Sequence, residues 1–210
     1  MGGGDRLTDE LKLEEFRQVN EYLRQSLNAM LTIINVSVSG IATLIAAAFA
    51  LVATRSSMGE WPASHLAPIF LVPLVIVVLS LSLLDAHRHD IYRFQYYLVV
   101  FHEEPHGLAA GWGTRSLLFR SRMPGEALDN VAIIYVTLAV ISAALAQLFA
   151  RGSGVISDAV LIGWTVLLPM VVWQARRFSR DRSPIEAQWR QVQAELLARE
   201  TGSSLQDHAR

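Results

Sequence analysis

Four long apolar segments divide the chain into alternating apolar and polar stretches. They cover residues 29–52, 66–84, 131–150 and 155–174. A helix of about 20 apolar residues crosses the hydrocarbon core of a bilayer, so each segment predicts a transmembrane helix. Four such segments in 210 residues leave too little polar chain to bury them in a soluble fold. The pattern therefore predicts an all-α, polytopic membrane protein with four transmembrane helices.

Three polar segments beside these spans repeat apolar residues every three or four positions, which is the spacing of one helix face. The three stripes are Leu13, Phe16, Val19, Leu23 and Leu27; Ile91, Phe94, Leu98 and Phe101; and Ile185, Trp189, Val192 and Leu196. Because no Gly or Pro interrupts 6–38 or 74–104, we expect the first two spans to continue as helices outside the membrane. Gly202 is expected to end the third helix. We expect these amphipathic helices to form a bundle; the alternative is that one or more lie flat on the lipid surface.

The distribution of Lys and Arg predicts which side of the membrane each polar segment faces. Sixteen of the eighteen basic residues fall on one side if both termini and the middle loop are cytoplasmic, as basic loops usually are. The predicted division is a cytoplasmic helix (1–28), a transmembrane domain (29–175) with a cytoplasmic insertion (85–127), and a C-terminal helix and tail (176–210).

Composition narrows the class of protein. Arginine supplies seventeen of the eighteen basic residues and alanine is abundant, a bias typical of GC-rich bacteria, so we expect a bacterial inner membrane. A formal net charge of −1 argues against nucleic-acid binding. The absence of cysteine excludes disulfides and thiolate metal sites. No cofactor motif is present, and none is expected.

Two groups of histidines and acids are the candidates for a metal centre. Asp85 and His89 are four residues apart and share a helix face, whereas His102 and His106 lie on either side of Pro105. A continuous helix would separate the two groups by roughly 20 Å, too far for ligands of one ion. We therefore expect no metal or catalytic site; a site assembled between chains is the alternative.

Two groups of residues are expected at the lipid headgroups. Aromatic residues and arginines favour that region, where rings are half buried and cations meet phosphates. The residues are Trp112, Arg115, Arg120 and Arg122 in the middle loop and Arg176, Arg177 and Arg180 after the fourth span. The expected partner of these side chains is the bilayer itself.

The first span carries a small and polar face that includes Asn35, Ser39 and Thr43. Residues of this kind allow close helix packing within the chain's own bundle. The same face would alternatively line a pore if several chains assembled. The sequence leaves both interpretations open.

One helical segment carries Arg93, Tyr97 and Phe101 at intervals of four, then Glu103 and a later Gly-Trp pair ending at Trp112. This pattern resembles a group of short bacterial four-span integral membrane proteins of unassigned function. The Gly-Trp pair departs from their pattern, because Gly113 stands where an acid is expected. The resemblance implies the membrane architecture and no activity.

Three functions are compatible with these features. The expected one is a non-enzymatic module, anchored in the membrane, that assembles with itself or docks a membrane partner. The alternatives are an oligomeric pore, which needs a continuous polar face, and a membrane metalloenzyme using residues of segment 85–106, which needs three converging ligands.

Overall fold

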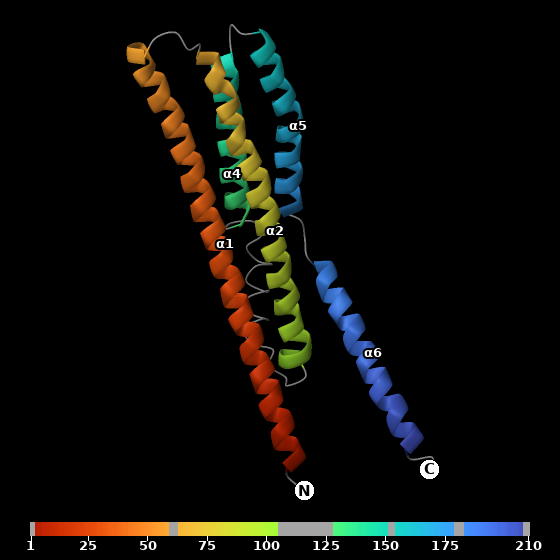
Figure 1. The fold of residues 1–210 in the computed structure, drawn as a ribbon. Coiled ribbons are helices and arrows are strands. Elements are labelled where there is room, and N and C mark those ends of the chain that lie inside the picture. Colours follow the sequence, from red (N-terminus) through yellow and green to blue (C-terminus); the bar gives the residue numbers. More distant parts are fainter. Residues whose placement is uncertain (1–2, 59–62, 105–127, 151–153, 179–182, 208–210) are drawn as a thin grey trace. The chain divides into compact units, whose positions relative to one another are not determined.

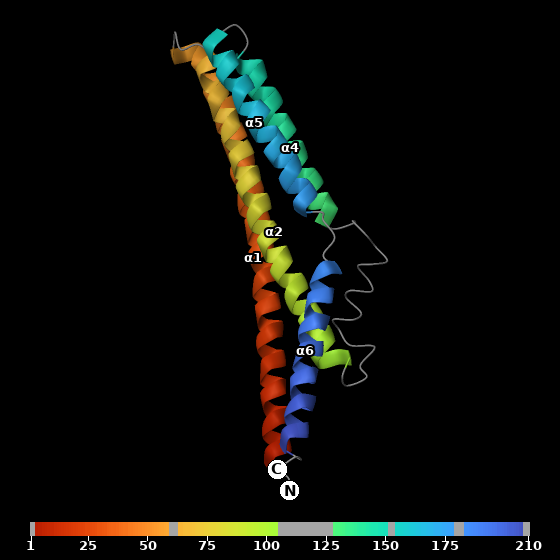
Figure 2. The same cartoon turned by 90° about the vertical axis from the view of Figure 1, so that its right-hand side faces the viewer.

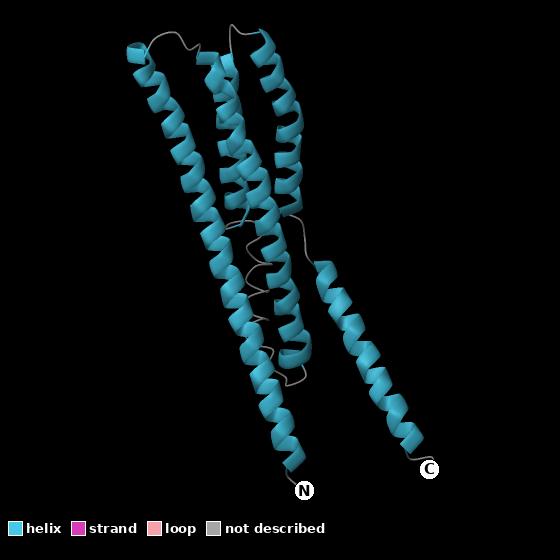
Figure 3. Ribbon diagram, viewed as in Figure 1, coloured by secondary structure: helices cyan, strands magenta, loops and turns pink. Residues whose placement is uncertain are grey.

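The computed structural model describes residues 3–58, 63–104, 128–150, 154–178 and 183–207, and these residues form helices and no strand (Figure 3). In chain order the α-helices are α1 (Gly3–Met58), α2 (Val72–Leu98), α4 (Leu128–Ala150), α5 (Gly154–Phe178) and α6 (Ser183–Asp207) (Figure 1). A 3₁₀ helix, η1 (Ala63–Leu71), leads into α2, and a π-helix, η2 (Val99–Glu103), follows it. The expected all-α fold is confirmed.

The chain forms two compact units, which we name by their composition. The apolar unit comprises Ala29–Ala86 and Gly125–Arg180, and the polar unit comprises Met1–Asn28, His87–Pro124 and Asp181–Arg210. Both α1 and α2 run from one unit into the other without a break in helix, as the absence of Gly and Pro predicted.

The described residues include four helical stretches long and apolar enough to cross a membrane: Glu10–Thr54, Leu66–Glu103, Asn130–Ala150 and Gly154–Phe178. The apolar part of the first starts near residue 29, and that of the second stops at residue 84. Each stretch therefore contains one of the four predicted spans. Four helices of this kind indicate a multi-pass membrane protein.

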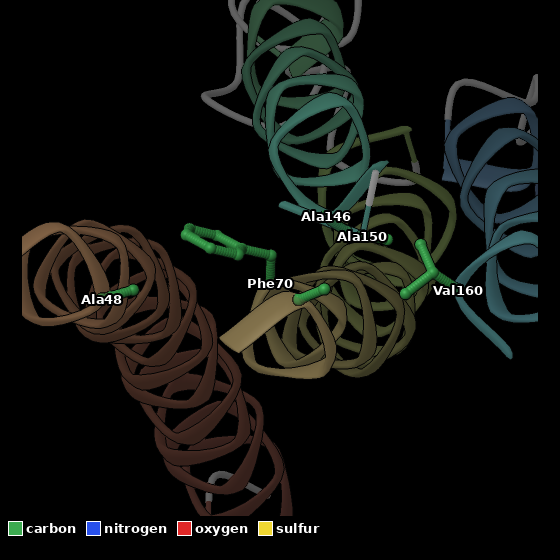
Figure 4. Close-up of a cluster of buried hydrophobic side chains, with 6 residues drawn as sticks. Ala48, Phe70, Ala146, Ala150 and Val160 are labelled. Atoms are coloured by element: carbon green, nitrogen blue, oxygen red, sulfur yellow. The ribbon is translucent and has the colours of Figure 1, made fainter. Parts of the chain in front are cut away.

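One apolar cluster joins all four spans of this unit. Phe70 of η1 lies between the α1 and α4 ribbons, beside Ala48 and Ala146 (Figure 4). Its ring stacks on Phe149 with centroids 5.1 Å apart, and Phe49 meets it edge-on at 6.2 Å. Alanines on α1 and α4 leave room for these rings, which is how small residues favour close helix packing in membranes.

Polar side chains also join helices of the apolar unit. The hydroxyls of Ser37 on α1 and Tyr135 on α4 are hydrogen-bonded, and Tyr135 also bonds with Ser80 on α2. The indole N–H of Trp164 on α5 donates to the carbonyl of Ala143 on α4 at 3.1 Å. Because the hydrocarbon core contains no water to replace them, such bonds hold spans together.

The polar unit contains the N-terminal part of α1, the C-terminal part of α2 with η2, and α6. The expected bundle of amphipathic helices therefore exists, but its contact faces differ from the predicted stripes. On α1, Leu23 is buried, while Leu27 and Leu13 are 42% and 52% exposed. On α6, Ile185 is buried, while Val192 and Leu196 are exposed.

Gly202 does not end the last helix, as the sequence suggested, because α6 continues to Asp207. A glycine inside a helix costs only about 1 kcal/mol relative to alanine. One such residue therefore weakens a long helix without stopping it.

Candidate functional site

The candidate site is a junction of three helices in the polar unit, centred on Tyr97. It comprises Glu15 and Phe16 of α1, Arg93 and Tyr97 of α2, Phe101, His102 and Glu104 at and after η2, and Trp189, Arg190 and Gln193 of α6. We call this set the Tyr97 junction. It contains Arg93, Tyr97 and Phe101, which lie at intervals of four residues on α2 and η2.

Trp189 is the residue of α6 that contacts all three of these side chains. Its ring centroid lies 5.2 Å from that of Tyr97 and 5.9 Å from that of Phe101, both edge-on. The guanidinium of Arg93 lies over the indole at 5.9 Å, and the indole N–H donates to the Arg93 carbonyl at 2.9 Å. Spacing by four residues puts the three side chains on one helix face, and Trp189 packs on that face. Figure 2 shows α6 running beside η2, at the C-terminal end of α2.

Two further contacts of α6 fix its position along η2. Arg190 donates to both carboxylate oxygens of Glu104, at 2.8 and 3.1 Å, and also pairs with Glu186. The amide of Gln193 donates to the Val100 carbonyl at 2.8 Å. Carbonyls in the last turn of a helix lack partners within that helix, so Gln193 satisfies a group that would otherwise need water.

The α1 side of the junction is built around the carboxylate of Glu15. The Tyr97 hydroxyl donates to this carboxylate, and the His102 Nε2 atom lies 3.6 Å from it. The Phe16 and His102 rings are 6.0 Å apart. About two turns further along α1, Tyr22 packs on Phe94 with centroids 4.6 Å apart. Polar and aromatic contacts therefore connect α1 to α2 over two turns.

The electrostatics of the junction keep the Tyr97 hydroxyl protonated. Burial, the hydrogen bond to Glu15 and the negative charge of Glu15 together raise the pKa of Tyr97 above its usual value of 10.0. The residue lies beyond the apolar part of α2, which stops at residue 84. As a hydrogen-bond donor to a carboxylate, Tyr97 is a structural contact across the ordinary pH range.

Three of the four candidate metal ligands, Asp85, His89 and His102, lie among the described residues, and each has a different environment. Among the described residues, no three His, Asp or Glu side chains are close enough to hold an ion. Asp85 pairs with Arg177, His89 is exposed, and His102 faces Glu15. His106 lies outside the described residues.

Asp85 and Arg177 form an ion pair between α2 and α5 that the sequence did not reveal. The Arg177 Nε atom lies 2.9 Å from the carboxylate, whose side chain is only 5% exposed. The same guanidinium lies 5.6 Å from the Trp173 ring centroid. Arg177 was predicted to face lipid phosphates; it has a protein partner as well, and its side chain remains 54% exposed.

The other predicted site residues divide between exposed and undescribed positions. Arg176 is exposed at the end of α5. Asn35, Ser39 and Thr43 are exposed on α1, and Glu103 is buried in η2. Trp112, Arg115, Arg120, Arg122 and Arg180 lie outside the described residues.

Sequence reasoning identified the Arg93–Tyr97–Phe101 face but not its partner. The available signal was Trp189, an aromatic residue on a predicted helix stripe. Glu186 and Arg190, four residues apart, also indicated a charged edge beside it. Nothing local to Glu15 distinguishes it from the neighbouring acid Glu14.

Comparison with protein-family models, curated proteins and solved structures finds no match to this chain.

Proposed function

We propose that this protein is a membrane-anchored assembly module whose apolar unit carries the polar unit as a docking platform on the cytoplasmic side. The Tyr97 junction is the observation that carries the proposal. Its aromatic and charged side chains contact one another across three helices, which is the arrangement of a structural joint. We also propose that the membrane is a bacterial inner membrane and that this chain is related to the short four-span proteins that its sequence resembles.

The apolar stripe of α6 supports a docking role. Trp189 contacts Tyr97 and Phe101 of the polar unit, but the same face of α6 continues through Val192 and Leu196, which are 39% and 46% exposed. A stripe that continues past its own junction offers an amphipathic surface to a helix of a membrane partner.

Photo-crosslinking from α6 tests this proposal in the membranes of the native host. A photoreactive residue at Leu196 is expected to give a discrete adduct with a partner protein. The matched control is Ala194, which is also exposed but lies on the opposite face of α6. Mass analysis with two differently tagged copies identifies adducts between copies of this chain. Equal adducts from both positions, or none from Leu196, would refute docking through this stripe.

The exposed polar face of α1 favours a second candidate, an oligomeric pore. Asn35, Ser39 and Thr43 are all exposed in the single chain, as a pore-lining face would be before assembly. Ion flux through liposomes containing the purified protein distinguishes the two functions: sustained flux supports the pore, and its absence alongside Leu196 adducts supports docking.

A further inference from the structure

One face of α1 within the apolar unit is made of small and polar residues, and it points away from the other described helices. Its members, which we call the α1 seam, are Thr32, Asn35, Ser39, Ala42 and Ala46, and all are exposed. The opposite face of the same helix is buried, with Ser37 at 6%, Ile41 at 0% and Ala48 at 1% exposure. The seam is therefore not the face by which α1 packs in its own bundle.

Asn35 makes this face costly to leave against lipid. It lies within a stretch from Gln25 to Thr54 that contains no charged residue, so a bilayer that accepts this span surrounds it with hydrocarbon. An amide has two N–H donors and a carbonyl acceptor. Lipid tails offer no partner to any of them, and each unsatisfied polar group costs several kcal/mol in that environment.

We propose that a second copy of this chain covers the α1 seam through a parallel α1–α1 contact within the membrane. All copies insert with the same orientation, so two α1 helices related by a two-fold axis meet at the same residues. Asn35 then meets Asn35, and each amide donates to and accepts from its counterpart. The face is self-complementary, so a second copy of this chain is the partner that fits it.

The spacing of the seam fits this contact. Its members recur at intervals of three, four, three and four, an average of 3.5 residues, which is the repeat of two helices in a left-handed crossing. Their small side chains let the two backbones approach closely. A buried Asn at such a position also fixes register and the number of strands.

A closed contact accounts for the seam better than a water-filled path does. Beyond Ser39 the seam continues as Ala42 and Ala46, and the hydroxyl of the neighbouring Thr43 donates back to the Ser39 carbonyl at 2.8 Å. A conducting face would have to stay polar across the span, whereas alanines suit a dry interface. The inference holds whether or not the polar unit docks a partner, because it rests only on α1 within the apolar unit.

Disulfide crosslinking of the full-length chain in liposomes tests the contact. The chain contains no cysteine, so Ala46→Cys and Ala47→Cys each introduce a single thiol. Both positions are exposed, but they differ by about 100° around the helix. Oxidation is expected to convert Ala46→Cys to a covalent dimer and to leave Ala47→Cys monomeric. Equal crosslinking at the two positions, or none at Ala46, would overturn the proposal.

The role of the amide is tested by dimer dissociation in bilayers, measured by energy transfer between labelled chains. Asn35→Leu is expected to raise the dimer dissociation constant about 5- to 30-fold, from the usual strength of a polar contact between spans. Asn35→Gln keeps an amide and should restore most of the affinity. An unchanged dissociation constant in Asn35→Leu would contradict the Asn35 pairing.

A charged, membrane-impermeant thiol reagent distinguishes a dry contact from a pore. The Ala46→Cys thiol is expected to resist it. Rapid modification would show water along the seam and overturn the closed contact. None of these measurements depends on the Leu196 adducts, so this inference and the docking function can fail separately.

Discussion

Replacing Trp189 with alanine should release α6 from the Tyr97 junction. The substitution removes two edge-on ring contacts, at 5.2 and 5.9 Å, and the 2.9 Å hydrogen bond to the Arg93 carbonyl. Aromatic pairs contribute about 0.5–1.5 kcal/mol each and a hydrogen bond about 1 kcal/mol. The expected loss is therefore about 2–4 kcal/mol of docking free energy.

Hydrogen exchange of α6 amides in the full-length protein measures this loss directly. If α6 opens locally, 2–4 kcal/mol corresponds to exchange faster by about 30- to 700-fold. Amides of α4 and α5, in the other unit, should keep their rates. Trp189→Phe keeps a ring and loses only the N–H donor, so its exchange should lie between those of wild type and Trp189→Ala.

Leu197 provides the control on the same helix. It is 56% exposed, so Leu197→Ala should change α6 exchange little. If Trp189→Ala leaves the exchange of α6 unchanged, or if Leu197→Ala accelerates it as much, the ring contacts do not hold the helix and the junction has been misinterpreted.

Three further outcomes are expected. Asp85→Asn should lower the thermal stability of the purified protein by about 1–2 kcal/mol, less than for a fully buried pair because Arg177 reaches solvent; a wild-type melting temperature would contradict this. Tyr97→Phe should cost about 1 kcal/mol at neutral pH by removing a donor to Glu15. Because the pKa of Tyr97 is raised in the fold, wild-type stability should fall as the pH rises above 10.0; Tyr97→Phe should fall less steeply, as followed by circular dichroism. A cysteine replacing exposed Gln191 should react with an impermeant maleimide in inside-out vesicles but not in intact cells; the reverse would place the polar unit outside.

Helix existence was predictable from the sequence because it depends on local patterns. The sequence alone shows four apolar runs of membrane length and long stretches without Gly or Pro. The continuity of α1 across residue 28 follows from such a stretch, residues 6–38, and the helix also runs through Gly40 to Met58.

The contact faces were less predictable, because which residues of a helix are buried depends on where its neighbours lie. Ser26 is buried at 4% exposure while Leu27 is 42% exposed, although hydrophobicity alone ranks them in the opposite order. On α6, Gln193 contacts the Val100 carbonyl while Val192 is exposed. A hydrogen bond to the end of another helix outweighs the apolar repeat at that position.

Long-range charge pairs were not predictable at all. Asp85 and Arg177 are far apart in sequence, and the residues around each of them do not indicate that the other is its partner. Asp85 was considered only with His89, its neighbour on the same helix face. The pair is formed by the packing of α5 beside α2, which no single-helix pattern contains.

The π-helix after α2 constrains the number of residues between Arg93 and Glu104. The Glu104 N–H donates to the carbonyl of Val99, which lies five residues earlier. In an α-helix the donor to a carbonyl lies only four residues after it. The turn thus holds one residue more than an α-turn does. Deleting one residue there would turn everything beyond it by about 100° relative to α2.

Helix α6 is sensitive to that rotation because it contacts both sides of the extra residue. Trp189 contacts Arg93 and Tyr97 before the π-helix, whereas the adjacent Arg190 binds Glu104 after it. A chain one residue shorter between Arg93 and Glu104 could satisfy one contact or the other, but not both. In related chains the number of residues in this interval should therefore be kept even where their identities change, and single-residue insertions or deletions should be tolerated only outside it.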